Sequence, residues 1–173
     1  MGGRGAASGA TGRALSLHDG ESETAGSYSE SLQSVMNGEM KSIPAEHART
    51  MLENGFDVRA SDGDQYHFGK DLVLKYENGI KQDGTEKKEG PDVARMRHLS
   101  YAVNALKSSK SEIYEQQGRI NQRLFLCRQG RNTATAVYVD SDNRAVRSYI
   151  YTNRREKQVD RFLEVRKKNF QKA

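Results

Sequence analysis

Three short runs of β-forming residues between Gln122 and Thr152 constrain the fold of this 173-residue chain more than any other feature. Turn-forming residues at 129–132 and 141–143 separate the runs, and this spacing predicts an antiparallel meander. In the third run, strict alternation assigns alternate residues to opposite faces, with one set being Val146, Ser148, Ile150 and Thr152 and the other Arg147, Tyr149 and Tyr151. Both faces of this strand therefore carry polar side chains, which is more polar chemistry than a packed core requires.

The clearest helix is expected at 92–108, after Pro91. Its apolar residues recur at helical spacing and form one stripe, namely Val93, Met96, Leu99, Val103 and Leu106. His98 lies off this stripe, beside small alanines and on the same side as Arg95. We therefore expect His98 and Arg95 to face a neighbouring element or a ligand, the alternative being that His98 is a plain surface residue.

The rest of the chain divides into three regions by composition. Residues 1–40 are expected to be a flexible Gly/Ser-rich tail, 41–90 a small helix–hairpin cap with a loop, and 91–173 an α+β domain. In that domain, helices pack on a three- to four-stranded antiparallel sheet. The local expectations are a helix at 44–54, a hairpin from 56–59 and 65–68, one more turn at 111–115, and a helix at 154–172 that buries Val159, Phe162, Leu163 and Val165.

Positive charge is concentrated at one end of the chain. The whole sequence has a formal net charge of +5, whereas residues 141–173 contain ten Lys and Arg against four Asp and Glu, a net charge of +6. Arg147, Arg154 and Arg155 belong to this group, and the bias favours an anionic partner, with nucleic acid first. The alternative interpretation is a solvated basic helix.

Several classes of protein and site are not favoured by the sequence. No apolar run approaches the roughly 18 residues that span a bilayer, so no membrane partner is expected. The single cysteine, Cys127, lies in an apolar run and is expected to be buried and inert. The four histidines have no metal-ligand spacing, so neither a metal nor another cofactor is expected.

The residue types that remain suit metal-independent cleavage of RNA. In this reaction the 2′-hydroxyl attacks the adjacent phosphorus, which requires a general base and a general acid, and a histidine can serve as either. Arginine stabilises the charge on the phosphorane oxygens, and Tyr, Ser or Thr hydroxyls can orient the phosphate. The same residues would equally suit passive binding of RNA or DNA.

Five short segments of the sequence are similar to those of a known protein family. They are Arg97-His98-Leu99, Ser111–Glu115, Arg123-Leu124-Phe125, Ala136–Val139 and Ser148–Thr152. Over roughly 92–170 the chain resembles the phage-borne nuclease domains of the barnase–EndoU–colicin–RelE superfamily. The resemblance implies catalytic roles for residues of the helix, the first strand and the last strand, namely His98, Arg123, Ser148, Tyr151 and Thr152. The chain departs from the family pattern at Lys110, where proline is usual. A second histidine is also missing, which leaves Tyr151 as a candidate acid.

The leading hypothesis is therefore a toxin-like or phage-encoded ribonuclease without metal. Arg95, Arg147, Arg154 and Arg155 are the candidate substrate-binding residues. The resemblance implies tRNA or mRNA as substrate, and an immunity or antitoxin protein and phage head proteins as partners. It also implies a location in the bacterial host cytoplasm or on the phage particle. Two alternatives stay open: a non-catalytic nucleic-acid-binding or phage structural module, and a transferase that acts on nucleotides.

Overall fold

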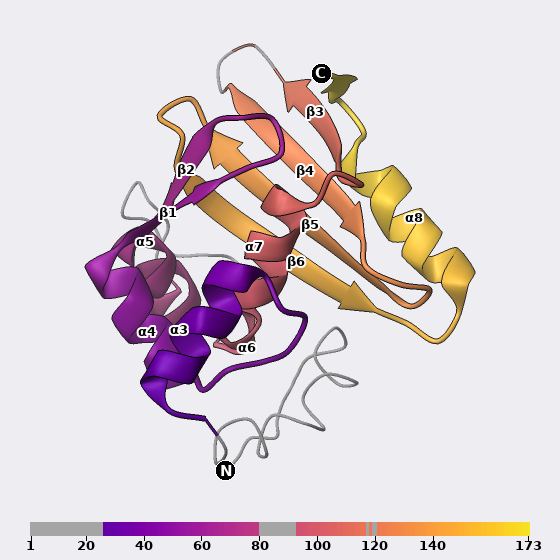
Figure 1. Ribbon diagram of the computed structural model, residues 1–173. Coiled ribbons are helices and arrows are strands. Elements are labelled where there is room, and N and C mark those ends of the chain that lie inside the picture. Colours follow the sequence, from indigo (N-terminus) through magenta and orange to yellow (C-terminus); the bar gives the residue numbers. More distant parts are fainter. Residues whose placement is uncertain (1–25, 80–92, 117, 119–120) are drawn as a thin grey trace.

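The structure, a computed structural model, describes residues 26–79, 93–116, 118 and 121–173 and has the predicted α+β class (Figure 1). A five-stranded antiparallel sheet forms its largest element, and a two-stranded sheet lies beside it. The segments 1–25 and 80–92, with most of the expected flexible tail and most of the loop expected at the end of the cap, lie outside the described residues. Within the described ranges, no helix has the length and apolar character needed to cross a bilayer.

The first described helix, α3 (Tyr28–Asn37), falls inside the segment that was expected to be a flexible tail, so the boundary at residue 40 is wrong. Ser27 caps α3, since its side-chain oxygen accepts a hydrogen bond from the Glu30 N–H at 3.2 Å and the Glu30 carboxylate accepts one from the Ser27 N–H at 2.9 Å. Val35 of α3 is fully buried in the core. The polar composition of the segment concealed this helix.

The predicted helix and hairpin of the cap are confirmed. Helix α4 (Ala45–Asn54) begins after Pro44 and ends at Gly55, which has a positive φ of 78°. Strands β1 (Phe56–Arg59) and β2 (Gln65–Phe68) then pair antiparallel around the turn. The next segment, whose type was left open, is a short helix followed by a π-helix, namely α5 (Lys70–Val73) and η2 (Leu74–Asn78).

The helix expected at 92–108 is two helices, α6 (Ala94–Arg97) and α7 (Leu99–Lys107). His98 joins them with φ −107° and ψ 26°, outside the helical range. The predicted position of His98 assumed one continuous helix with a rotation of about 100° per residue. Because the backbone leaves the helical conformation at His98, this rotation does not relate the residues before it to those after it. The predicted apolar stripe from Met96 to Leu106 is buried, whereas Val93 is exposed.

The three-stranded meander is confirmed and forms most of the large sheet, whose strand order is β6-β5-β4-β3-β7. Its strands are β3 (Glu112–Gln116), β4 (Gln122–Arg128), β5 (Thr133–Asp140), β6 (Ala145–Thr152) and β7 (Gln171–Lys172). The extra turn predicted at 111–115 is wrong, because this segment is β3. Pairing with β4 satisfies its backbone groups, and such a partner is not visible in a local sequence pattern.

The C-terminal helix, α8 (Glu156–Arg166), is shorter than expected because the chain ends in β7 against β3. Val159 is buried as predicted, and Phe162 and Leu163 pack against the sheet. The prediction for Val165 is wrong, since this side chain is exposed. Figure 1 shows α8 along the side of the sheet away from α7.

The two faces of the large sheet have separate apolar clusters. On the first face, strand residues such as Phe125 and Val137 join α7 and the cap helices in one buried core, so the cap and the sheet are packed together. On the second face, Leu124, Tyr138 and their neighbours pack against α8. Alternation along each strand therefore decides which helix a side chain meets.

A bulge changes the predicted alternation at the start of β6. Tyr138 pairs with Arg147, but Val139 pairs with Ala145, so Val146 is an extra residue on β6. Val146 consequently packs with Tyr138 on the α8 face, and its predicted placement on the face of Ser148 is wrong. The bulge leaves Arg147 and Tyr149 on the face of the sheet that α8 covers.

Candidate anion-binding site

Tyr149, in the middle of β6, lies among three arginines from three different elements. The guanidinium carbons of Arg95 on α6 and Arg166 on α8 lie 4.1 Å and 4.2 Å from the centre of the Tyr149 ring. The guanidinium of Arg147, on β6, stacks at 4.1 Å on Tyr138, whose ring meets that of Tyr149 edge to face. We call Arg95, Arg147, Arg166 and Tyr149 the arginine–tyrosine cluster. Guanidinium groups on ring faces make favourable cation–π contacts, which orient the charged groups.

The three positive charges change the acidity of the Tyr149 phenol. Burial alone would raise the pKa of this phenol, because it disfavours the phenolate. The charges of Arg147, Arg95 and Arg166, with a hydrogen bond from Arg95, outweigh burial and lower the pKa of Tyr149 below its ordinary value. The surroundings of this hydroxyl therefore stabilise negative charge.

Arg147 and Arg166 differ from most half-buried arginines in the described part of the chain, because no carboxylate of that part lies within ion-pair distance of either. The Nε atom of each is buried and has no hydrogen-bond partner among the described residues. Five other arginines each have a carboxylate partner, namely Arg49, Arg123, Arg128, Arg131 and Arg144. The cluster thus holds positive charge that carboxylates do not balance at Arg147 and Arg166.

Neighbouring elements hold β6 in place. The Tyr76 hydroxyl of η2 accepts a hydrogen bond from the Ser148 N–H at 2.7 Å, and Lys75 Nζ donates to the Val146 carbonyl at 2.6 Å. Since β6 is at the edge of the sheet, these side chains supply hydrogen-bond partners that an adjacent strand would otherwise provide. The strand that carries Arg147 and Tyr149 is therefore anchored from outside the sheet.

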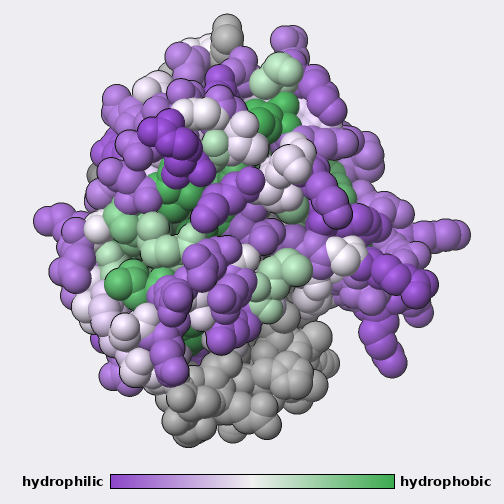
Figure 2. Space-filling model, in the orientation of Figure 1, coloured by the Kyte–Doolittle hydropathy of each residue, from purple (hydrophilic) through white to green (hydrophobic). Residues whose placement is uncertain are grey.

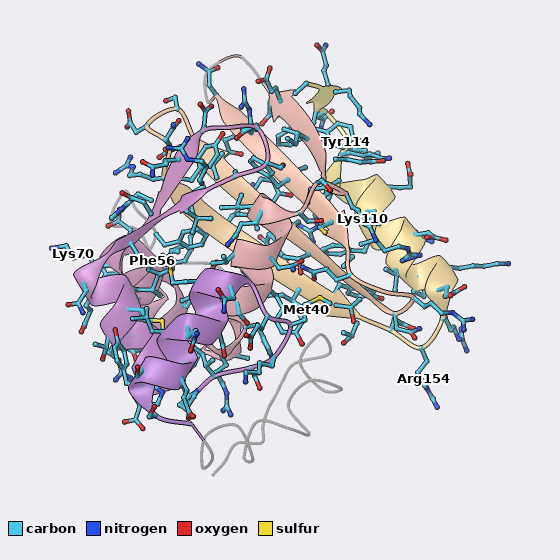
Figure 3. The ribbon with its side chains drawn as sticks, viewed as in Figure 1. Met40, Phe56, Lys70, Lys110, Tyr114 and Arg154 are labelled. Carbon is cyan, nitrogen blue, oxygen red and sulfur yellow. The ribbon has the colours of Figure 1, made fainter. Side chains whose placement is uncertain are left out.

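Two further basic residues lie at the turn between β6 and α8, at the opposite end of α8 from Arg166. Arg154 and Arg155 are both exposed, and Arg155 is the N-cap residue of α8. Figure 3 shows Arg154 extending away from the ribbon beyond the end of the sheet. Hydrophilic residues cover the side of the molecule where α8 lies (Figure 2).

His98, the predicted acid or base, is buried at the junction of α6 and α7. Its exposed fraction is only 3%, and its ring contacts Tyr101 edge to face at 5.7 Å. The alternative that His98 is a plain surface residue is wrong, because its ring is buried against other residues of the protein, and this burial leaves no exposed side for a ligand. It therefore occupies the position of a packed core histidine.

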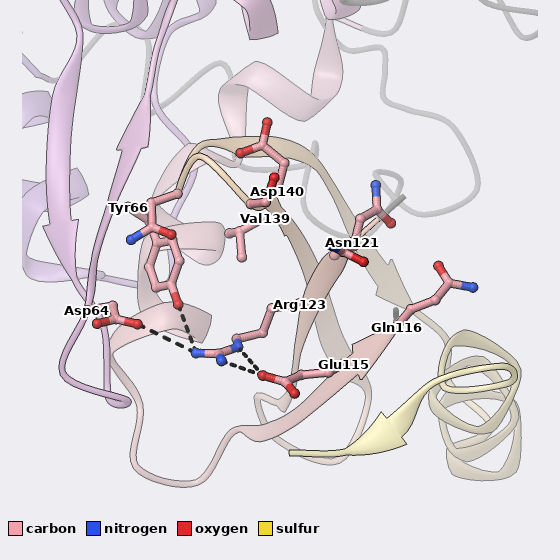
Figure 4. A pocket seen from close by; sticks show the side chains of 11 residues that line it. Asp64, Tyr66, Glu115, Gln116, Asn121, Arg123, Val139 and Asp140 are labelled. Carbon is pink, nitrogen blue, oxygen red and sulfur yellow. Dashed lines mark hydrogen bonds and ion pairs between the residues drawn. The ribbon is translucent and has the colours of Figure 1, made fainter. Parts of the chain in front are cut away.

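Arg123, the predicted phosphate contact, lies in a polar cavity of about 200 Å³ between β2 and the large sheet (Figure 4). Its guanidinium forms an ion pair with Glu115, lies 2.7 Å from Asp62 and 3.6 Å from Asp64, and donates to the Tyr66 hydroxyl at 3.3 Å. Burial alone would lower the pKa of Arg123, but its hydrogen bonds to Glu115 and Asp62 raise it. The carboxylates neutralise this arginine, so it has no unbalanced charge for a phosphate.

The remaining predicted residues do not assemble around one hollow. Arg123, Ser148 and Thr152 lie on the α7 face of the sheet, whereas Tyr151 lies on the α8 face and stacks on Phe162 at 5.1 Å. Ser148 is also buried beneath Tyr76. The single site that the resemblance implied, with His98, Arg123 and Tyr151 converging, is therefore not observed.

Two predicted substrate-binding residues, Arg95 and Arg147, do come together, and they meet around two residues that had no predicted role. Tyr149 alternates with Arg147 on β6, and Arg166 belongs to the basic C-terminal stretch, so a weak signal existed for both. Their proximity was not visible because α6, β6 and α8 are distant in sequence. Among the described residues, no group of three or more His, Cys, Asp and Glu side chains could hold a metal ion.

Comparison with known proteins adds no assignment. No protein-family model, curated protein sequence or solved structure matches this chain.

Proposed function

We propose that this protein binds single-stranded RNA, and that the arginine–tyrosine cluster receives a phosphate of the strand. The observation that carries the proposal is the half-buried pair Arg147 and Arg166, which lies beside the Tyr149 phenol without a carboxylate partner in the described part of the chain. Guanidinium groups match phosphate oxygens with paired donors, so such a pair is suited to this ligand.

The surroundings of the cluster favour a polymer over an isolated anion. Arg154 and Arg155 are exposed at the turn that joins β6, which carries Arg147 and Tyr149, to α8, which carries Arg166. Basic residues at more than one position along a strand can each attract a phosphate, and binding then releases counterions. Aromatic residues beside arginines are typical of sites for single strands, whose bases can stack on the rings.

The experiment is a titration of a labelled single-stranded RNA with the full chain, followed by fluorescence anisotropy at several salt concentrations in EDTA. We expect the affinity to fall steeply as salt rises, and Arg147→Gln and Arg166→Gln each to weaken binding and reduce the salt slope by about 1. The matched control is Arg131→Gln, which removes the same charge from an exposed arginine paired with Glu156. The absence of binding at low salt, or equal losses in all three variants, would refute the proposal.

Metal-independent RNA cleavage is the second candidate, and one observation favours it. The Tyr149 phenol, whose pKa three arginines lower, would donate its proton to the leaving 5′-oxygen of a phosphodiester that those arginines hold, while the attacking 2′-hydroxyl loses its proton to solvent. Cleavage of the same RNA in EDTA that disappears in Tyr149→Phe and persists in Tyr151→Phe would support this function. RNA that stays bound and intact over long incubation would instead support binding alone.

A further inference from the structure

The arginine–tyrosine cluster has features that distinguish one kind of phosphate from another, and the inference drawn from them rests on the proposed RNA binding. Arg147 and Arg166, which have no carboxylate within ion-pair distance among the described residues, place two positive charges beside the Tyr149 phenol, more than one singly charged phosphodiester would balance. A phosphate monoester carries a charge of about −1.5 to −2 at pH 7 and has three oxygens that accept hydrogen bonds. The number of donors and the charge both correspond better to the monoester.

The position of the cluster also favours the end of a strand. Its arginines come from α6, β6 and α8, and the rings of Tyr138, Tyr149 and Phe162 pack beside their guanidinium groups. The cluster is half-buried, and the Nε atoms of Arg147 and Arg166 are fully covered. When an internal phosphodiester is bound in such a site, the RNA strand must leave it in two directions. A terminal phosphate requires space for the strand on one side only. Enclosure by side chains from three elements therefore restricts the internal group more than the terminal one.

We propose that the arginine–tyrosine cluster recognises the terminal phosphate monoester of an RNA strand and discriminates against a strand that ends in hydroxyl groups. The exposed arginines at the β6–α8 turn then contact the phosphodiesters that follow. In this arrangement Arg147 and Arg166 determine the preference for the end, and Arg154 and Arg155 contribute affinity that does not depend on it.

The test compares three single-stranded RNAs of identical sequence, with a 5′-phosphate, a 3′-phosphate, or hydroxyls at both ends, by anisotropy with the full chain. We expect one phosphorylated RNA to bind at least about tenfold more tightly than the hydroxyl form at pH 7.5. The advantage should decrease at pH 5, because the second ionisation of a monoester has a pKa of about 6. Inorganic phosphate should compete with the phosphorylated RNA and leave binding of the hydroxyl form largely unchanged.

The variants assign the preference to the cluster. Arg147→Gln and Arg166→Gln should lose the preference for the phosphorylated end yet still bind the hydroxyl RNA, whereas Arg131→Gln should keep the preference. Where a glutamine variant does not fold, Arg147→Lys or Arg166→Lys tests the same point, since lysine keeps the charge and loses the paired donors.

The outcomes separate this inference from the proposed function. Equal affinity for all three RNAs would overturn end recognition and leave RNA binding intact. A preference that survives in both Arg147→Gln and Arg166→Gln would show that the end is recognised elsewhere and would also overturn the inference. Failure to bind any of the three RNAs would remove both proposals.

Discussion

The hydroxyl of Tyr76 accepts a hydrogen bond from the backbone N–H of Ser148 at 2.7 Å and lies 3.3 Å from the Ser148 side-chain oxygen. Tyr76 belongs to the π-helix η2, and Ser148 lies on β6, an edge strand of the large sheet. Because both are buried, this contact provides a partner for a backbone N–H that has no access to water. It connects the cap to the strand that carries Arg147 and Tyr149.

Removal of this hydroxyl should destabilise the protein. We expect Tyr76→Phe to lower the free energy of unfolding by about 1–3 kcal/mol, since it leaves the buried Ser148 N–H without its acceptor. Urea unfolding followed by circular dichroism measures the change. Tyr28→Phe is the control, because the described structure has no hydrogen bond from the Tyr28 hydroxyl, and this variant should be nearly as stable as the wild type. Equal stabilities of Tyr76→Phe and the control would contradict the role of the contact.

The phenol of Tyr149 should ionise at lower pH than an ordinary tyrosine. Near-ultraviolet absorbance measured against pH reports phenolate formation, and the difference between the wild type and Tyr149→Phe isolates this residue. We expect its pKa to lie below the usual value of about 10 and to rise in Arg166→Gln, because a neighbouring positive charge favours the phenolate. Arg131→Gln should not move it. A Tyr149 that titrates with the ordinary tyrosines would show that the three arginines do not act on it.

His98 should contribute to stability and have no direct role in RNA binding. Its side chain is buried at the junction of α6 and α7, so His98→Ala leaves a cavity and should lower the free energy of unfolding by about 2–4 kcal/mol. At a temperature where the variant is folded, its affinity for RNA should equal that of the wild type. A stable His98→Ala protein that has lost RNA binding or cleavage would instead restore His98 as a site residue.

The Asp62 carboxylate should make stability depend on pH. Burial alone would raise its pKa, but hydrogen bonds from Tyr66, the Asp64 N–H and Arg123 lower it. A carboxyl group with a lowered native pKa stabilises the fold above its unfolded pKa, which is about 3.9, and loses this contribution as the pH falls through the native value.

Asp62→Asn should therefore lower the free energy of unfolding by about 1–3 kcal/mol at pH 7, and the difference from the wild type should shrink below about pH 4. Urea unfolding across this pH range measures it. Asp160→Asn is the control. This carboxylate of α8 is exposed and pairs with Arg128, so its removal should have a much smaller effect on stability. A difference for Asp62→Asn that is constant with pH would show that ionisation of the carboxyl is not its cause.

Elements with signals in adjacent residues could be predicted from the sequence. Helix α4 has Pro44 before it and Gly55 after it, and the strands of the meander are separated by residues that favour turns. The local sequence signals for β3 and α3 were too weak to predict either element. Strand β3 is held by its pairing with β4. Helix α3 is stabilised by its capping box and by the packing of a few residues such as Val35. Pairing and packing with distant segments outweighed the local propensities there.

The sequence by itself determined the α+β class, the meander, the hairpin of the cap and the basic character of the C-terminal end. It also indicated Arg95 and Arg147 as candidate binding residues. Only the tertiary structure decided that His98 is buried, that carboxylates neutralise Arg123, and that Arg166 meets Tyr149. The reason is that spacing within one segment records which side of a helix or strand a residue occupies, whereas the sum of charges at a site depends on which segments fold against one another.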